Sequence, residues 1–435
     1  MKHLLLTLAV AGLAPCLVNA AEPTERVAEP TFTEWHDLSV NNVNRFATRT
    51  SFFAYENREA ALKGNRDKSS NFLSIEGEWR FQWVENADQR PTDFFRTDYN
   101  DAAWKNMRVP GIWELNGYGD PEYVNIGFAW RGHFKDNPPM VPTKDNHVGS
   151  YRRTIRIPDS WNGRQVIAHF GSVTSNMYLW VNGHFVGYGE DSKSAMEFDI
   201  TPFLKKGDNL IAFQTFRWCD GSYLEGQDMW HLAGIHRDVY LMATPKVAVS
   251  DHYITSQLNE GYTAGSMNVE LTVNNSLKQS ASKTLEVELL DPAGHLVAKK
   301  QQAVALTAKD AQKTVSIDFE GLNDLKLWSS EHPWLYTVIV RQLNNSSEEM
   351  VFSTKYGFRA VEQKGNLIYV NGKRVYFKGV NTQDIHPLLG HAIDVNTMLR
   401  DVELMKKANV NTVRTSHYPR QAKMYAMFDY YGLYC

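Results

Sequence analysis

Short runs of alternating apolar and polar residues fill the first half of the chain. From about Thr31 to Met242 they are separated by Gly, Pro, Asn and Asp, as in GEWRFQWV, SYRRTIRIP and NLIAFQTFRW. A period of two residues is typical of strands with one buried face. The Asn-Gly pair in NMYLWVNGHFVGYG favours a tight hairpin turn. The pattern predicts an antiparallel β-sandwich, and we assign residues 21–244 to this domain.

The alternation continues over residues 245–355 with longer runs and fewer aromatic residues. Examples are MNVELTVNN, KTLEVELLDPAG, KTVSIDFEG and LYTVIVRQL. Strand signals that recur about every 8 to 12 residues are typical of a sandwich of immunoglobulin type. This second domain shows no cluster of chemically useful side chains, so we expect it to be structural.

The pattern changes after Tyr356. RVYFKGVN reads as a strand, DVNTMLRDVELMKKANV as a helix, NTVRTS as a strand and PRQAKMYAMFDYYG as a second helix. The first helix has five apolar residues on one face: Val395, Met398, Leu399, Val402 and Met405. Alternating strands and helices are how a parallel α/β domain begins. Residues 356–435 are therefore predicted to be the first part of a β/α barrel.

The last helix has Met424, Tyr425, Phe428 and Tyr431 on one face, and 433–435 reads as the start of another buried strand. A barrel sheet with only two strands has unpaired edges and no closed interior. We therefore expect a truncated barrel in which this apolar face is left to water. Residues after about 356 are expected to be sensitive to proteases.

Composition excludes one class of partner and leaves another open. The 435 residues suggest about three domains. Lys+Arg 46 against Asp+Glu 49 gives a net charge of -3, and no basic stripe follows the chain, so we expect no nucleic-acid partner. The 12 Trp, 20 Tyr and 21 Phe suit large β-sheet cores and, equally, surfaces that stack on sugar rings.

Residues 1–20 have the features of a cleaved signal peptide. Lys2 precedes an apolar run over 4–13, and Val18-x-Ala20 suits a cleavage site, so we expect a periplasmic or secreted protein. The run is shorter than the ~20 apolar residues of a membrane span, and no later segment reads as one. A lipoprotein modified at Cys16 is the alternative. Cys219 and Cys435 are too few for a disulfide framework.

Polar segments follow both strands of the predicted barrel. Asp384 and His386 lie in NTQDIHP, and Arg414 and His417 lie in RTSHYP. Chemistry in such barrels occurs at the carboxyl ends of the strands, so these side chains are expected to face one mouth. A single His is more often structural, but two such segments at successive strand ends strengthen the functional interpretation.

A segment near the end of the first domain, RWCDGSYLEGQDMWHLAGIHRDVY, combines acids with aromatic rings. Asp220, Glu225 and Asp228 lie among Trp218, Tyr223 and Trp230. Carboxylates beside rings suit a sugar site or a site for a hard cation. An ordinary sandwich loop with its rings in the core is the alternative, and the same two interpretations apply to Asn125 in DPEYVNIGF.

Several long motifs occur in an order that resembles one known family. They are EGEWRFQW, VPGIWELNGYGDPEYVN, VGYGEDSKSAMEFDIT, RWCDGSYLEGQDMW, LWSSEHPWLYTV, NGKRVYFKGVN and VNTVRTSHYP. From about Trp35 to its last residue the chain resembles the N-terminal part of large bacterial β-galactosidases of glycoside hydrolase family 2. YGEDS and GQDMW are more similar to the galactosidase branch than to the glucuronidase or mannosidase branches.

The resemblance implies a jelly-roll domain, an immunoglobulin-like domain and the start of a catalytic (β/α)8 TIM barrel. It implies an enzyme that removes terminal non-reducing β-D-galactose from β-galactosides with retention of configuration. The complete enzyme would require Mg²⁺ and Na⁺, and we expect it to form a homo-oligomer. The alternative is a non-catalytic carbohydrate-binding or scaffold fragment, and the nucleotide sequence after Cys435 would discriminate the two.

The resemblance also implies roles for individual residues. Asn125 matches an Asn that contacts the substrate, and Asp228 matches an Asp that touches galactose and helps to hold Na⁺. His417 matches a His that binds sugar hydroxyls and stabilises the transition state, and Arg414 an Arg close to the nucleophile. Gln383 replaces the family's His in NRHE, which assists the transition state. Gln can donate a hydrogen bond but cannot carry charge.

Retaining glycosidases need two carboxylates, an acid/base and a nucleophile, about 5 to 5.5 Å apart. The resemblance implies that both Glu and the Mg²⁺ ligands come from later barrel strands, so we expect no catalytic residue within this chain. Glu403 lies within a predicted helix, where a surface role is expected. The chain alone is therefore expected to be inactive.

Overall fold

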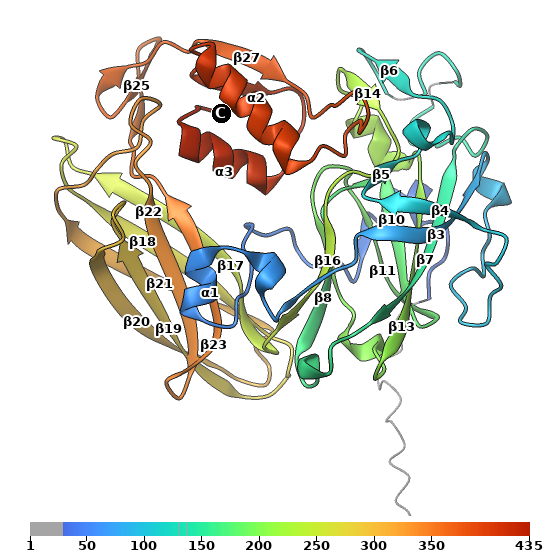
Figure 1. Ribbon diagram of the computed structural model, residues 1–435, viewed down its shortest axis with the longest axis horizontal. Helices are drawn as coiled ribbons and strands as arrows, with labels where there is room; N and C mark the ends of the chain where they lie inside the picture. The colour runs from blue at the N-terminus through green and yellow to red at the C-terminus, as the bar shows by residue number, and fades with distance from the viewer. Residues whose placement is uncertain (1–28, 129, 136) are drawn as a thin grey trace, which may run out of the picture.

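The computed structural model describes residues 29–128, 130–135 and 137–435. Two β-sandwiches stand side by side, and two helices near the C-terminus lie above the gap between them (Figure 1). The predicted signal peptide and Cys16 lie outside the described residues. No helix in the described part is long and apolar enough to cross a membrane.

The first sandwich consists of two antiparallel sheets. Their facing sides enclose an aromatic-rich core that includes Trp79, Tyr151 and Phe213. The seven-stranded sheet has the order β1 (Asn42–Val43), β11 (His184–Glu190), β10 (Asn176–Val181), β13 (Asp208–Phe216), β7 (Val148–Arg156), β3 (Gly77–Val84), β4 (Lys105–Val109). The four-stranded sheet has the order β12 (Met196–Asp199), β8 (Gln165–Phe170), β16 (Val239–Thr244), β2 (Phe72–Ser74).

The predicted Asn-Gly turn joins β10 to β11. Asn182 and Gly183 have φ of 53° and 88°, the left-handed values that a two-residue hairpin of this kind requires. Two smaller sheets lie at one end of the sandwich. They are β5 (Gly111–Ile112), β15 (Gly234–Ile235) and β9 (Val173–Thr174), and β14 (Met229–His231) with β6 (Glu122–Val124).

The second sandwich has sheets of three and four antiparallel strands around an aliphatic core. They are β17 (Val247–Leu258), β18 (Gly265–Asn275) and β21 (Gln312–Leu322), and β20 (Leu296–Leu306), β19 (Ala281–Leu290), β22 (Tyr336–Asn344) and β23 (Ser347–Tyr356). The N-terminal segment also contributes to this core. Phe53 and Tyr55 are buried in it, and α1 (Arg58–Lys63) packs on β22 and β23. The strand pattern had placed this segment with the first sandwich only.

The C-terminal region begins with a small antiparallel sheet, β24 (Val361–Lys364), β25 (Leu367–Val370) and β26 (Lys373–Arg374). Then follow β27 (Gly379–Thr382), α2 (Val395–Lys407), β28 (Thr412–Thr415) and α3 (Ala422–Tyr431). β27 and β28 pair in parallel, and Tyr434 forms a further parallel bridge to Thr412. The predicted fold class, two sandwiches followed by a barrel start, is confirmed.

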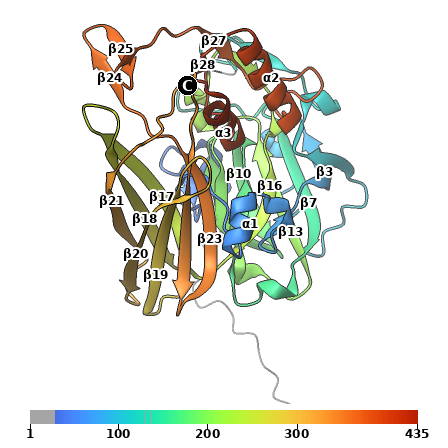
Figure 2. The same ribbon diagram turned by 60° about the vertical axis from the view of Figure 1, so that its left-hand side comes forward.

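The apolar face of α3 is buried, and our expectation that it is left to water is wrong. Met424 and Phe428 are only 2% and 1% exposed, in a cluster with Met398 and Val402 of α2. Below them, the indole nitrogen of Trp328, from the second sandwich, donates to the carbonyl of Asp429 at 2.8 Å. Figure 2 shows α2 and α3 packed together above both sandwiches. The sandwiches thus supply part of the surface that further barrel units would otherwise provide.

Candidate functional site

The strand pair β6 and β14 places Asn125 and Asp228 at adjacent positions. Met229 pairs with Val124 in this antiparallel ladder. Continued by one residue, the same register sets Asp228 opposite Asn125. Asn125 is exposed and Asp228 half-buried, so both can reach a ligand. Two residues that are about 100 positions apart in the sequence therefore share one edge of the first sandwich.

Asp228 is held by a tyrosine that sequence reasoning missed. The hydroxyl of Tyr123 donates to Oδ1 of Asp228, and this hydrogen bond raises the pKa of Tyr123. No hydrogen-bond donor among the described residues reaches Oδ2 of Asp228, so that oxygen is free to accept from a ligand. The signal was present in the sequence, because Tyr123 is two residues from Asn125 and shares its strand face.

Two exposed rings lie beside this carboxylate. Tyr123 is 50% and Trp230 is 38% exposed, and their rings make an edge-on contact with centroids 5.4 Å apart. Large exposed rings next to a carboxylate suit a sugar, whose ring stacks on aromatics while its hydroxyls donate to oxygen. The arrangement therefore has the chemistry of a carbohydrate site.

Gln383 joins the barrel start to this strand pair. It directly follows β27, and its Nε2 donates to the main-chain carbonyl of Asp228 at 2.9 Å. One N–H of the Gln383 amide is thus in use, and its second N–H and its carbonyl oxygen can serve a ligand.

His391 makes a second link from the same loop. Its Nε2 lies 2.8 Å from the carbonyl of Trp230, two residues along β14 from the carbonyl that Gln383 binds. Burial, assisted by Lys193, lowers the pKa of His391 to about 4, so the ring is neutral and has one N–H. Its Nδ1 lies 2.5 Å from the main-chain carbonyl of Asp384 and 3.5 Å from the hydroxyl of Tyr418. The neutral ring therefore lies between two carbonyl acceptors and donates to one of them, so it ties the loop after β27 to β14.

Asp384 is buried within the loop after β27, and one ring nitrogen of His386 is used within the same loop. Asp384 is only 5% exposed and lies 3.4 Å from Nε of Arg420 and 3.9 Å from Nη2 of Arg237. Its main-chain amide donates to the hydroxyl of Tyr418. Nδ1 of His386 accepts from the amide of Leu388, within a tight turn. The expected place of Asp384 at the barrel mouth is therefore corrected, because burial and its two arginine neighbours occupy its carboxylate; the expected place of His386 stays a prediction.

Arg414 and His417 lie on β28 and just after it. Arg414 pairs across the sheet with Asn381 and is exposed, and His417 is half-buried. Because β27 and β28 are parallel neighbours, Gln383 and His417 follow the same edge of the sheet. Within the described part of the chain, no hydrogen bond joins His417 to Asp228. His417 is connected to the sugar-site residues only through its position on the same sheet edge as Gln383.

The other two acids of the aromatic segment lie elsewhere. Glu225 accepts from the amide of Ser192, which fixes the loop after β11. Asp220 lies with Glu190 and Cys219, and their potential ligand atoms are all within 4.8 Å of one another. Burial raises the pKa of Glu190 to about 8, which favours its protonated form at neutral pH, and burial also raises the pKa of Asp220. Asp220, Glu225 and Asp228 do not form one site.

The carboxylate and the exposed rings of the first sandwich thus lie beside the carboxyl edge of a parallel β/α unit. Three models of one family match the chain in succession: the sugar-binding domain of glycosyl hydrolases family 2 at residues 72–245, glycosyl hydrolases family 2 at 247–359, and its TIM-barrel domain at 361–435. The chain belongs to glycosyl hydrolases family 2.

Curated relatives share the same extent of sequence. A protein named beta-galactosidase from Priestia megaterium is 38% identical over 93% of this chain, and one from Halalkalibacterium halodurans is 36% identical over 92%. The matches cover 39% and 38% of those relatives. The chain thus spans about two fifths of the length of these relatives.

Solved structures share the fold. A Bacteroides uniformis beta-glucuronidase 2 superposes with a TM-score of 0.71 at 23% identity, over 83% of this chain and 41% of that one. A putative beta-galactosidase from Bacteroides fragilis gives a TM-score of 0.66 at 21% identity, over 83% and 52%. At these identities the likeness shows the architecture alone.

Proposed function

We propose that this chain is part of a β-galactosidase, in which it supplies the wall of the site that binds the galactosyl ring. The observation that carries the proposal is the adjacency of Asp228 and Asn125, with Gln383 fastened to the same strand. A pyranose hydroxyl donates well to a carboxylate that has one oxygen free. The relatives at 35–38% identity are named beta-galactosidases, which favours galactose as the sugar.

The acid/base and the nucleophile are proposed to come from other residues than these 435. A retaining mechanism needs two carboxylates about 5 to 5.5 Å apart. At the edge described here Asp384 is ion-paired and Asp228 already accepts from Tyr123, so neither is placed for that role. In this proposal, His417 and Asn125 orient sugar hydroxyls, and Arg414 contributes positive charge beside the nucleophile.

Cation roles are a further part of the proposal. The free oxygen of Asp228 suits one ligand position for Na⁺, which prefers oxygen donors. Asp228 belongs to no cluster of three His, Cys, Asp or Glu ligand atoms within the described residues, so the remaining oxygens would come from main-chain groups or other residues. Mg²⁺ is proposed to bind to residues beyond this chain.

The test is turnover of chromogenic glycosides by the longest protein that the reading frame encodes. We expect hydrolysis of a β-galactoside in preference to a β-glucuronide or β-mannoside, and a loss of about a hundredfold or more in kcat/KM for Asp228→Ala. The 435-residue chain alone is expected to give no turnover. Preference for a glucuronide, or full activity in Asp228→Ala, would contradict the proposal.

Export is proposed from the N-terminal sequence alone. A mature N-terminus near Ala21 would place the enzyme in the periplasm or outside the cell. Mass spectrometry of the expressed protein tests this. An intact Met1 in the cytoplasm would refute it, and a lipid on Cys16 would show the lipoprotein alternative.

A further inference from the structure

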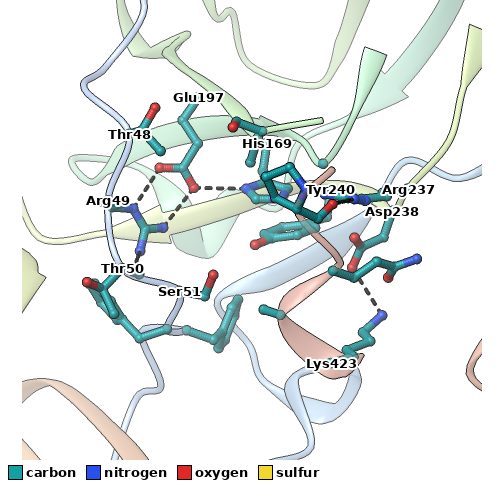
Figure 3. A pocket seen from close by; sticks show the side chains of 18 of the residues that line it. Thr48, Arg49, Thr50, Ser51, His169, Glu197, Arg237, Asp238, Tyr240 and Lys423 are labelled. Carbon is teal, nitrogen blue, oxygen red and sulfur yellow. Dashed lines mark hydrogen bonds and ion pairs between the residues drawn. The ribbon is translucent and has the colours of Figure 1, made fainter. Parts of the chain in front are cut away.

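A cavity of about 340 Å³ lies where three parts of the chain meet, apart from the strand pair that holds Asp228. Its walls come from the N-terminal segment 46–53, from the first sandwich around Glu197 and Tyr240, and from the start of α3. Figure 3 shows Arg49, Glu197 and His169 on one side of it and Asp238 and Lys423 on the other. Nothing in the proposed glycosidase chemistry uses this cavity.

Basic groups outnumber acids in its lining. Six basic side chains face two carboxylates: Arg49, Arg66, Lys193, Arg237, Arg420 and Lys423 against Glu197 and Asp238. Nε and Nη2 of Arg49 each donate to Glu197 at 2.7 Å, and His169 approaches the same carboxylate at 2.9 Å. The carboxylate of Glu197 thus already has two partners, and it does not neutralise the other basic side chains of the lining.

Two other carboxylates, those of Asp238 and Asp384, also contact two basic side chains each. Asp238 accepts from Arg66 and, at 3.2 Å, from Lys423. Asp384 lies behind the wall and serves both Arg237 and Arg420. Two basic side chains around Asp238, and two around Asp384, leave a net positive charge in each of these groups. Burial, followed by the nearby Arg237, lowers the pKa of Lys193 to about 7, so this side chain carries only part of a positive charge at neutral pH.

Two further elements of the cavity lining carry donor groups. Arg420 is 3% exposed, and its Nη1 has no hydrogen-bond partner within the described residues, although a buried guanidinium is normally satisfied. The ten-residue helix α3 begins at the same wall, and its N-cap Gln421 makes no side-chain cap. Free amides at a helix N-terminus favour anions. Thr48 and Ser51 add hydroxyls to the wall.

We propose that this cavity binds a phosphate group, either free phosphate or the phosphate of a small sugar. The volume is large enough for a group of that size with part of a sugar ring, within the range of small-molecule sites. A bound phosphate would contact both sandwich-side and barrel-side donors, and would therefore stabilise the docking of α3 on the first sandwich. The proposal does not depend on which glycoside the enzyme cleaves.

The experiment is titration calorimetry of the 435-residue chain with inorganic phosphate and with glucose 6-phosphate, at constant ionic strength. Lys423→Gln removes one donor, and Thr48→Asp adds a negative charge at an exposed wall position that tolerates substitution. Both variants are expected to weaken binding about tenfold, the size of one charge-assisted hydrogen bond. Lys407→Gln, at an exposed position near the end of α2, is the matched control and should bind like the parent.

Equal affinity for the two ligands would identify free phosphate as the occupant. Higher affinity for glucose 6-phosphate would identify a sugar phosphate as the occupant. Absence of binding of either ligand at millimolar concentration would overturn the proposal. Binding that neither Lys423→Gln nor Thr48→Asp weakens would also overturn it, because the anion would then lie elsewhere. Circular dichroism of each variant shows whether it is folded.

Discussion

The side-chain amide of Gln383 donates a hydrogen bond to the main-chain carbonyl of Asp228. A residue of the barrel start thus fixes the segment of the first sandwich whose carboxylate is the candidate group for binding a sugar. This contact gives a physical role to a residue that the family resemblance had marked only as a departure. Gln383 acts here by positioning the start of β14, and Nε2 of His391 lies 2.8 Å from the carbonyl two residues further along the chain.

Gln383→Glu is predicted to loosen β14. The substitution keeps the size of the side chain but sets a carboxylate against a carbonyl and removes the donor. The loss of one hydrogen bond of about 1 kcal/mol corresponds to about fivefold faster local amide exchange. Hydrogen exchange followed by mass spectrometry over residues 227–231 checks this. Gln363→Glu, on the exposed strand β24, is the control, and equal exchange in the two variants would disprove the positioning role.

Asp228→Ala is predicted to abolish galactose binding by the 435-residue chain. With one wall of the site present, we expect parent affinity in the millimolar range or weaker, about 4 kcal/mol or less. Tyr123→Phe should weaken binding less, because it frees Oδ1 without removing the carboxylate. Calorimetry measures all three proteins, with the exposed Asp88→Ala as the control. Micromolar binding that survives Asp228→Ala would refute the assignment.

Glu197→Gln is predicted to destabilise the protein at neutral pH and much less in acid. Burial alone would raise the pKa of Glu197, but Arg49 and His169 outweigh it and hold the pKa far below its usual value. A depressed carboxyl pKa stabilises the fold above the unfolded value of about 4.5, and this stability is lost as pH falls. Removal of one partner of such a pair costs about 3 kcal/mol.

The difference from the parent should shrink by about 1.4 kcal/mol for each pH unit below about 4.5. Urea unfolding between pH 3 and pH 7 measures it. Glu78→Gln is the control, since Glu78 is exposed on β3. A pH-independent difference would show that lost packing, not charge, explains the effect.

The barrel start is predicted to resist proteases as long as Trp328 anchors α3. Trp328→Phe removes the indole donor to Asp429 and leaves a small void, which should cost about 1–3 kcal/mol. Limited proteolysis should then cleave the variant in 422–431 faster than the parent. Trp334→Phe is the matched control, because Trp334 is 44% exposed in the same loop. Rapid cleavage of the parent at α3 would restore our first expectation for this region.

The sequence alone determined the secondary structure and the order of the domains. Period-two alternation predicted β3, β7 and β13, and the Asn-Gly pair predicted the β10–β11 turn. These features are local, since each strand or turn is specified by residues within about ten positions. The candidate residues Asn125, Asp228 and Gln383 were likewise found from the sequence, although by resemblance to a family and not by spacing.

Only the tertiary structure decided which of these residues meet. The contacts of Asp228 with Tyr123 and Gln383 span 105 and 155 positions, and no local pattern encodes them. Burial of Asp384 between Arg237 and Arg420 likewise depends on the docking of the barrel start against the sandwich. The face of α3 is covered by α2, and no pattern within either helix encodes that contact. Periodicity specifies which face of an element is apolar, whereas the surface that covers that face is fixed only when the domains pack together.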